Sequence, residues 1–205
     1  MRRWWVLGCA VLGGCSGGQD SAIGRPQMEA AAAEVPPSGG VVDSALPIAE
    51  HLRRFRSGLD STDRLRGGAP TPAVLARRFL RALAARDSAG LARMVLSRAE
   101  YGWVYYPSHI YHDPPYELDP NTFWMLIQAN SGKGFVRLLR RYAGRELAFR
   151  HLRCTPSRNV RPPLREVERC TLDFDVDGTS ESRRMFGSIV GDATGYKFVS
   201  YANEF

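Results

Sequence analysis

The pattern of apolar and polar positions predicts a pair of helices between Thr71 and Leu96. Thr71 is a suitable N-cap because its hydroxyl can accept from a free backbone N–H, and Pro72 suits the first helical position. A second, shorter helix begins at Asp87 or Ser88. Apolar residues recur at helical spacing through both helices: Leu75, Phe79, Leu83, Leu91, Met94 and Val95. Since arginines occupy the other faces, the pair must bury one side against another layer.

The segment after this pair changes its pattern twice. Residues 101–106 alternate in size and aromatic character, which predicts a short strand followed by a Pro-rich loop over residues 107–120. Asp119 and Pro120 then begin a further helix with a broad apolar face. Its pattern is interrupted at Gly132 and resumes afterwards. One bent helix or two short helices would satisfy this interrupted pattern.

The last third of the chain has the period of two that is typical of strands. The strand candidates cover residues 146–155, 166–176, 182–191 and 195–203. In the second candidate apolar residues alternate with polar ones, so one face is buried. Short connections between consecutive strands favour an antiparallel meander. Helices first and antiparallel strands last predict an α+β fold, with the helices on one face of the sheet.

A short amphipathic helix and a linker are predicted for residues 44–70. Ser44 is a candidate cap, and the apolar stripe consists of Ile48, Leu52, Phe55 and Leu59. The stripe either docks on the following domain as a brace or lies on an anionic lipid surface. Because the stripe is short and narrow, docking on the domain is the favoured interpretation.

Residues 1–14 have the layout of an export signal. Two arginines precede an apolar run, Trp4–Leu12, that is too short to span a bilayer. The sequence Leu12-Gly13-Gly14-Cys15 resembles the lipobox of bacterial lipoproteins, which are cut before the cysteine and acylated on it. The resemblance implies a membrane anchor at Cys15, and Ser16, where an Asp would favour the inner membrane, favours the periplasmic face of the outer membrane. An ordinary secretory signal with a coincidental cysteine is the alternative.

Composition adds a tether and argues against one class of partner. Residues 15–43 are rich in Gly, Ala, Pro and Ser, which predicts a flexible tether. The formal net charge is +7, yet Lys occurs only at Lys133 and Lys197. The arginines are spread over helices and strands rather than gathered in one tract. That distribution makes nucleic acid an unfavoured partner.

Export also bears on Cys154 and Cys170, because exported proteins fold in an oxidising environment. Both cysteines lie in strand candidates, and a hairpin centred near Pro162 would place them opposite each other. We therefore predict a Cys154–Cys170 disulfide, which is worth about 3 kcal/mol in the chain-entropy model.

The order of elements over residues 71–205 resembles the nuclear transport factor 2-like (NTF2-like), cystatin-related superfamily. The resemblance rests on the helix pair with its pattern FLRALAARDSAGLARMV, the aromatic segment, a further helix and four strands ending in GYKFVSY. It implies a curved sheet that wraps a long helix into a cone, often with a pocket at the open end. Members include isomerases, dehydratases and non-enzymatic binding modules, so the fold alone assigns no activity. The resemblance also implies that a homodimer through the outer sheet face is one arrangement to test.

Candidate ligand-binding residues follow the helix pair: Tyr101, Trp103, Tyr105, Tyr106, His109, Asp113 and Trp124. Buried Tyr and Trp side chains with inward polar groups would make a good wall for a small ligand. No stretch matches the superfamily's catalytic motifs, so we assign no catalytic residue and no cofactor. His109, His112 and Asp113 could be read as a metal cluster, but the surrounding prolines favour an irregular loop and a third ligand would have to come from elsewhere.

These features predict a lipid-anchored envelope protein whose domain binds a small-molecule or protein ligand without chemistry. The alternative is an isomerase- or dehydratase-like enzyme that uses Tyr and Asp in the cone. That alternative requires an enclosed cavity with an inward carboxylate.

Overall fold

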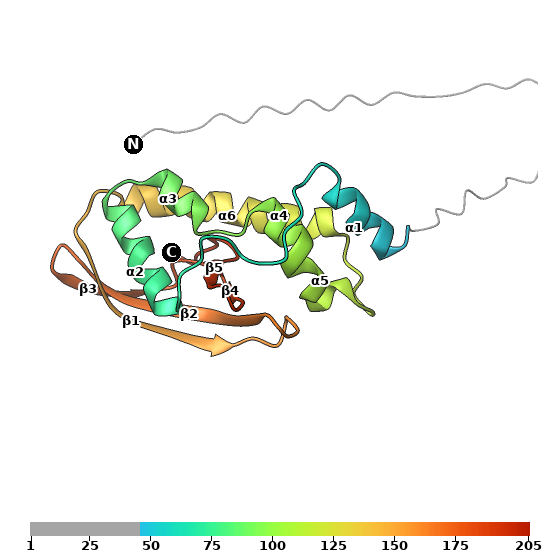
Figure 1. The fold of residues 1–205 in the computed structure, drawn as a ribbon. Helices are drawn as coiled ribbons and strands as arrows, with labels where there is room; N and C mark the ends of the chain where they lie inside the picture. Colours follow the sequence, from blue (N-terminus) through green and yellow to red (C-terminus); the bar gives the residue numbers. More distant parts are fainter. Residues whose placement is uncertain (1–45) are drawn as a thin grey trace, which may run out of the picture. The chain divides into compact units, whose positions relative to one another are not determined.

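The computed structural model describes residues 46–205, an α+β domain with helices packed on an open antiparallel sheet (Figure 1). Residues 46–205 belong to one compact unit. The predictions for the signal peptide, Cys15, the tether and the Ser44 cap lie outside the described residues. Figure 1 shows the helices gathered on one face of a curved sheet, as the order of elements predicted.

The predicted helix pair is confirmed as α2 (Pro72–Ala84) and α3 (Ser88–Arg93). The Thr71 side chain caps α2 by accepting from Val74 N at 3.2 Å, and Asp87 caps α3 by accepting from Gly90 N at 2.7 Å. The apolar stripe of α2 is buried in the main hydrophobic core. Local capping chemistry therefore places this pair as the sequence indicates.

The helix predicted after Asp119 is a single continuous element, α6 (Pro120–Tyr142). Asp119 caps it by accepting from Thr122 N at 2.8 Å. Gly134 does not break the helix but lets it approach the C-terminal segment: a Cβ there would lie 1.7 Å from the carbonyl oxygen of Tyr201. This glycine serves close packing rather than a helix end.

The strand predicted for residues 101–106 is wrong, because this segment is helical. Residues 101–106 belong to the π-helix η1 (Tyr101–Tyr105) and to the start of α5 (Tyr106–Ser108). The short helix α4 (Arg98–Glu100) precedes them, and the 3-10 helix η2 (Ile110–His112) follows. A capping box between Ser97 and Glu100 starts α4. Tyr101 and Tyr105 are four residues apart, so a helix places both on one buried face. The four-residue spacing of the buried tyrosines therefore predicts this segment better than the alternation of large and small residues does.

The sheet has β2 (Arg165–Val176) at its centre, paired with β1 (Leu147–Pro156) on one side. On the other side β3 (Thr179–Arg183) and β4 (Ile189–Gly191) pair with opposite ends of β2. β5 (Tyr196–Phe198) pairs with β4, and all four pairings are antiparallel.

The third and fourth predicted strands need correction. Residues 182–191 do not form one strand, since β3 ends at Arg183 and β4 begins at Ile189. Met185 and Phe186 between them are both buried, which a flat strand with alternating faces does not allow. The strand predicted for residues 195–203 is limited to β5.

The predicted disulfide is confirmed: Cys154 on β1 is bonded to Cys170 on β2. The register pairs Arg153 with Thr171 and Thr155 with Glu168, so the strands carry an irregularity beside the bridge. Arg169, which has a φ of 51°, takes up the extra residue of this bulge.

The helix α1 (Ile48–Arg56) packs on the domain as the favoured interpretation expected. Leu52 and Phe55 of its apolar stripe are buried. The Phe55 ring lies 5.2 Å from the Tyr101 ring and 6.4 Å from the Trp124 ring, measured between centroids. These side chains belong to a second, more aromatic hydrophobic cluster beside the main core.

Candidate functional site

The three tyrosines predicted to line a pocket are core residues. Tyr101, Tyr105 and Tyr106 are fully buried. The Tyr101 hydroxyl donates to Pro120 O at 3.0 Å, and the Tyr106 hydroxyl donates to Leu118 O, so both hold the start of α6 in place. Burial raises the pKa of each of the three phenols above its ordinary value. Their assignment to a ligand site stays a prediction.

His109 and Asp113 lie in different surroundings. The His109 ring is 4% exposed and packs against Tyr105, Tyr111 and Phe123. Burial lowers the pKa of His109 to about 4. The Asp113 carboxylate is hydrogen-bonded to Nδ1 of the His112 ring at 2.8 Å and also accepts a hydrogen bond from the Arg161 guanidinium. Within residues 46–205 no group of three His, Cys, Asp or Glu side chains is arranged to hold a metal ion.

The two candidate tryptophans, Trp103 and Trp124, have different neighbours. The Arg56 guanidinium lies over the Trp103 ring, 4.2 Å from its centroid, and Trp103 Nε1 is buried without a hydrogen-bond partner among the described residues. Trp124 lines a cavity of the described domain that also contains Leu96, Phe135 and Tyr201.

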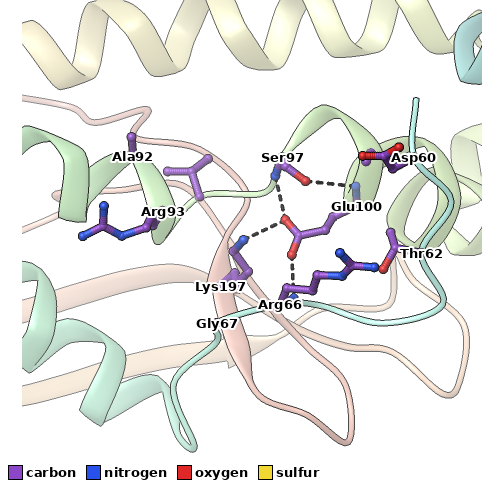
Figure 2. Close-up of a pocket in the computed structure, with 11 residues that line it drawn as sticks. Asp60, Thr62, Arg66, Gly67, Ala92, Arg93, Ser97, Glu100 and Lys197 are labelled. Carbon is purple, nitrogen blue, oxygen red and sulfur yellow. Dashed lines mark hydrogen bonds and ion pairs between the residues drawn. The ribbon is translucent and has the colours of Figure 1, made fainter. Parts of the chain in front are cut away.

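A cleft of about 600 Å³ with five charged residues in its walls is the best-supported site in the described domain, and we call it the Lys197 cleft. Its walls come from the α1–α2 connection, the segment from α3 to α4, and β5: Asp60, Thr62, Arg66, Gly67, Ala92, Arg93, Val95, Ser97, Ala99, Glu100 and Lys197. Figure 2 shows Glu100 and Lys197 pointing toward each other, with Arg66 and Arg93 on either side of them. The volume falls within the usual range for small-molecule sites.

The floor of this cleft is a buried ion pair. Lys197 Nζ lies 2.7 Å from Glu100 Oε2, and the two residues are 4% and 2% exposed. Ser97 N donates to the same oxygen at 2.7 Å, and Arg66 N donates to Oε1 at 2.7 Å. The Glu100 carboxylate is therefore saturated with donors, which offset its desolvation.

Backbone pairing on both edges of β5 fixes the position of Lys197. One edge pairs with β4, where Val190 lies opposite Lys197. On the other edge Tyr196 exchanges two backbone hydrogen bonds with Ala69, at 2.7 and 2.9 Å, Phe198 N donates to Met94 O at 2.9 Å, and Phe198 O accepts from Leu96 N at 3.0 Å. The two segments that line the cleft are thus held against the strand that carries its lysine.

The charge of the cleft favours an anion. The walls contain three cationic side chains, those of Arg66, Arg93 and Lys197, and two carboxylates, those of Asp60 and Glu100, which leaves a net charge of +1. Glu100 is already neutralised by Lys197. Arg66 and Arg93 are exposed at the rim, where an incoming anion meets them first.

Comparisons with known proteins do not assign this chain to a family. No protein-family model, curated protein or solved structure matches it significantly. In addition, none of the helices within residues 46–205 has the length and apolar character needed to cross a membrane. The site must therefore be judged from its own geometry.

A second cavity, which we call the Trp124 groove, lies beside the first and has a volume of about 380 Å³. It runs between α6 and the segment from Ala92 to Arg98. Its walls are mainly apolar and contain one charged residue, Arg98: Leu96, Arg98, Trp124, Phe135 and Tyr201, with Gln128, Ser131 and Gly132. Ala92, Val95 and Ser97 line both cavities. The two cavities are therefore neighbours across one short stretch of chain.

The cleft was missed in the sequence, although two signals pointed to it. Ser97 and Glu100 have the spacing of a capping box, which the aromatic residues after them obscured. Lys197 is one of two lysines in the chain and interrupts an otherwise apolar strand. A lysine in such a strand requires a buried carboxylate partner, but the pattern does not say which one.

Proposed function

We propose that this protein is an exported lipoprotein whose domain binds a small anionic ligand in the Lys197 cleft. The observation that carries the proposal is the buried Lys197 ammonium, which has three donors and, among the described residues, one acceptor, Glu100 Oε2. An oxyanion in the cleft would accept from the remaining donors. Arg66 and Arg93 supply further charge-assisted contacts at the rim.

Binding without chemistry is the best-supported role of this cleft. Both oxygens of Glu100 accept hydrogen bonds from neighbouring donors, so the carboxylate is poorly placed to act as a base. The Ser97 hydroxyl accepts from Glu100 N at 3.1 Å, and no activating base lies beside it within the described residues. Lys197 acts here as a fixed positive charge.

The enzyme alternative rests on a different pair. The Tyr105 hydroxyl donates to Glu166 Oε1 at 3.1 Å, and Ser188 also donates to this carboxyl. Burial raises the pKa values of both Tyr105 and Glu166. However, Tyr105 and Glu166 are only 2% and 5% exposed, so a reactant would have to displace packed side chains to reach them. Binding in the Lys197 cleft is therefore the preferred function.

We also propose that the domain is a relative of the NTF2-like, cystatin-related group. The supporting observations are the helix pair, the long α6 and a curved antiparallel sheet with the helices on one face. The space between sheet and helices is filled by packed aromatic rings, including those of Phe79, Phe198 and Tyr201. The proposed ligand site is consequently at the side of the domain rather than inside a cone.

A homodimer through the outer sheet face stays a prediction. That face carries ion pairs, Arg150 with Asp175 at 2.6 Å and Arg153 with Asp173 at 2.5 Å, rather than a large apolar patch. Light scattering on the purified chain would measure its mass directly.

Export and anchoring are tested separately from ligand binding. In a bacterial host, the wild-type chain should incorporate labelled palmitate and fractionate with membranes. The Cys15→Ser variant should lose the label. A wild-type chain that stays unlabelled and fractionates as soluble would refute the anchor while leaving the cleft proposal intact.

The cleft is tested with the full chain carrying Cys15→Ser and two probes, citrate and inorganic phosphate. Each probe should raise the melting temperature of this protein in a saturable way, because a ligand of the folded state stabilises it. The Arg66→Gln/Arg93→Gln variant should bind at least tenfold more weakly. The control Arg140→Gln/Arg158→Gln removes the same charge from exposed positions outside the cleft. Equal weakening by both variants would show a nonspecific charge effect and contradict the site.

A further inference from the structure

We infer, on the basis of the proposed function, that the ligand is an anionic amphiphile with one alkyl chain. Its headgroup occupies the Lys197 cleft and its chain lies in the Trp124 groove. The charge of the cleft indicates an anion but does not say what else the ligand contains. The position of the Trp124 groove next to the cleft indicates the alkyl chain.

The first argument is continuity. The two cavities share three wall residues, Ala92, Val95 and Ser97, so a ligand that leaves the cleft over this segment enters the groove at once. Val95 supplies apolar surface between them, since it forms part of both walls. In Figure 2 the same segment runs between α6 and the Glu100–Lys197 pair.

The second argument is the contrast in chemistry. The cleft presents three cations, those of Arg66, Arg93 and Lys197, whereas the groove presents Leu96, Trp124 and Phe135 with a single cation, that of Arg98. An inorganic or short organic anion would use only the first set. An alkyl chain attached to the anion would remove apolar surface of the groove from water, which strengthens binding with each buried methylene.

The third argument is the shape of the groove wall at Gly132. A Cβ at Gly132 would meet no atom within 4 Å, so the wall of α6 is open at this point. Two residues further along, Gly134 is instead pressed against the backbone of Tyr201. The space at Gly132 is thus not required by packing within the described domain, and it enlarges the groove.

The test uses calorimetric titration of the full chain carrying Cys15→Ser with inorganic phosphate, butyl phosphate, octyl phosphate and octyltrimethylammonium, below their micelle concentrations. We expect affinity to increase about two- to fourfold per methylene between butyl and octyl phosphate, since an open groove buries part of each methylene. Octyltrimethylammonium should bind at least tenfold more weakly than octyl phosphate. Equal affinity for butyl and octyl phosphate would contradict the inference that the ligand is an amphiphile, while the proposal that the Lys197 cleft binds an anion would still hold. Failure of all the anions to bind would refute both.

A blocking variant locates the chain. A Cβ at Gly132 meets no atom within 4 Å, and Gly132→Trp should place its ring in the groove and remove most of the gain from butyl to octyl phosphate. The matched control is Ala129→Trp, on an exposed position of α6 that does not line the groove. Butyl phosphate should bind both variants as it binds the parent. If Gly132→Trp keeps the full octyl gain, the chain lies elsewhere and the inference is wrong.

Discussion

Lys197 Nζ on β5 lies 2.7 Å from Glu100 Oε2 on α4, in a pair that is almost completely buried. The two residues are 97 positions apart in the chain. Their contact holds the segment around α4 against the C-terminal strands. It also forms the floor of the cleft, so the same pair bears on stability and on binding.

Removing only the lysine should be strongly destabilising. Lys197→Met leaves the Glu100 carboxylate buried without its cation, which costs about 3–5 kcal/mol of unfolding free energy. The double variant Glu100→Gln/Lys197→Met removes both charges and should recover part of that loss, because the Gln amide oxygen can still accept from one of the two backbone N–H groups. Urea denaturation of the three proteins measures the difference. A single variant as stable as the parent would show that the pair is hydrated rather than buried.

The two glycines of α6 should respond in opposite directions to the same substitution. Gly132→Ala should stabilise the domain by about 0.5–1 kcal/mol, because Ala is the better helix former and the site is open. Gly134→Ala should destabilise it, because the new Cβ would lie 1.7 Å from Tyr201 O. Thermal unfolding of both variants decides the matter. If Gly134→Ala is also stabilising, α6 does not approach the C-terminal segment as closely as described.

Reduction of the Cys154–Cys170 disulfide should lower stability without changing the fold. The bridge spans 16 residues, for which the chain-entropy model gives about 3 kcal/mol. Denaturation of the parent with and without reductant measures this loss. A Cys154→Ser/Cys170→Ser variant should show no effect of reductant. Equal stability of oxidised and reduced parent would contradict the prediction.

His109 should make the domain sensitive to mild acid. Its pKa is about 4 in the folded protein against 6.5 when unperturbed, so the folded state disfavours the protonated ring. The stability that depends on neutral His109 is complete above about pH 6.5 and falls as the pH drops toward 4, by about 3 kcal/mol in total. The aromatic rings that surround it, Tyr105, Tyr111 and Phe123, offer no compensating charge.

The measurement compares the parent with His109→Phe at pH 7.5, 6, 5 and 4. The difference in unfolding free energy should move in favour of the variant as the pH falls. Titration of all other groups is common to both proteins. A difference that stays constant across this range would mean that His109 is solvated.

Features encoded by neighbouring residues were predictable from the sequence. The caps at Thr71 and Asp87 placed α2 and α3, because a cap and the helix it starts lie within a few residues of each other. The disulfide followed from two cysteines in adjacent strand candidates. In these cases the decisive interactions are local, or lie within one hairpin.

The features that were not predicted are of two kinds. Some depend on contacts between residues far apart in the chain, and others occur where the residue pattern fits both a strand and a helix. Tyr101 and Tyr105 fit both a strand period and a helical spacing, and burial against Phe55 and Trp124 favours the helix. The Lys197 cleft is assembled from segments far apart in the chain. No pattern in any one of these segments indicates which of the other two it will meet.

The central claim is that an anion binds in the Lys197 cleft, and an NMR titration tests it most directly. The ¹⁵N-labelled full chain carrying Cys15→Ser is titrated with citrate. The account predicts saturable amide shifts centred on Arg66, Gly67, Ser97 and Ala99, with little change on the outer sheet face around Arg150 and Arg153. Absence of saturable shifts, or shifts centred on that sheet face, would contradict it.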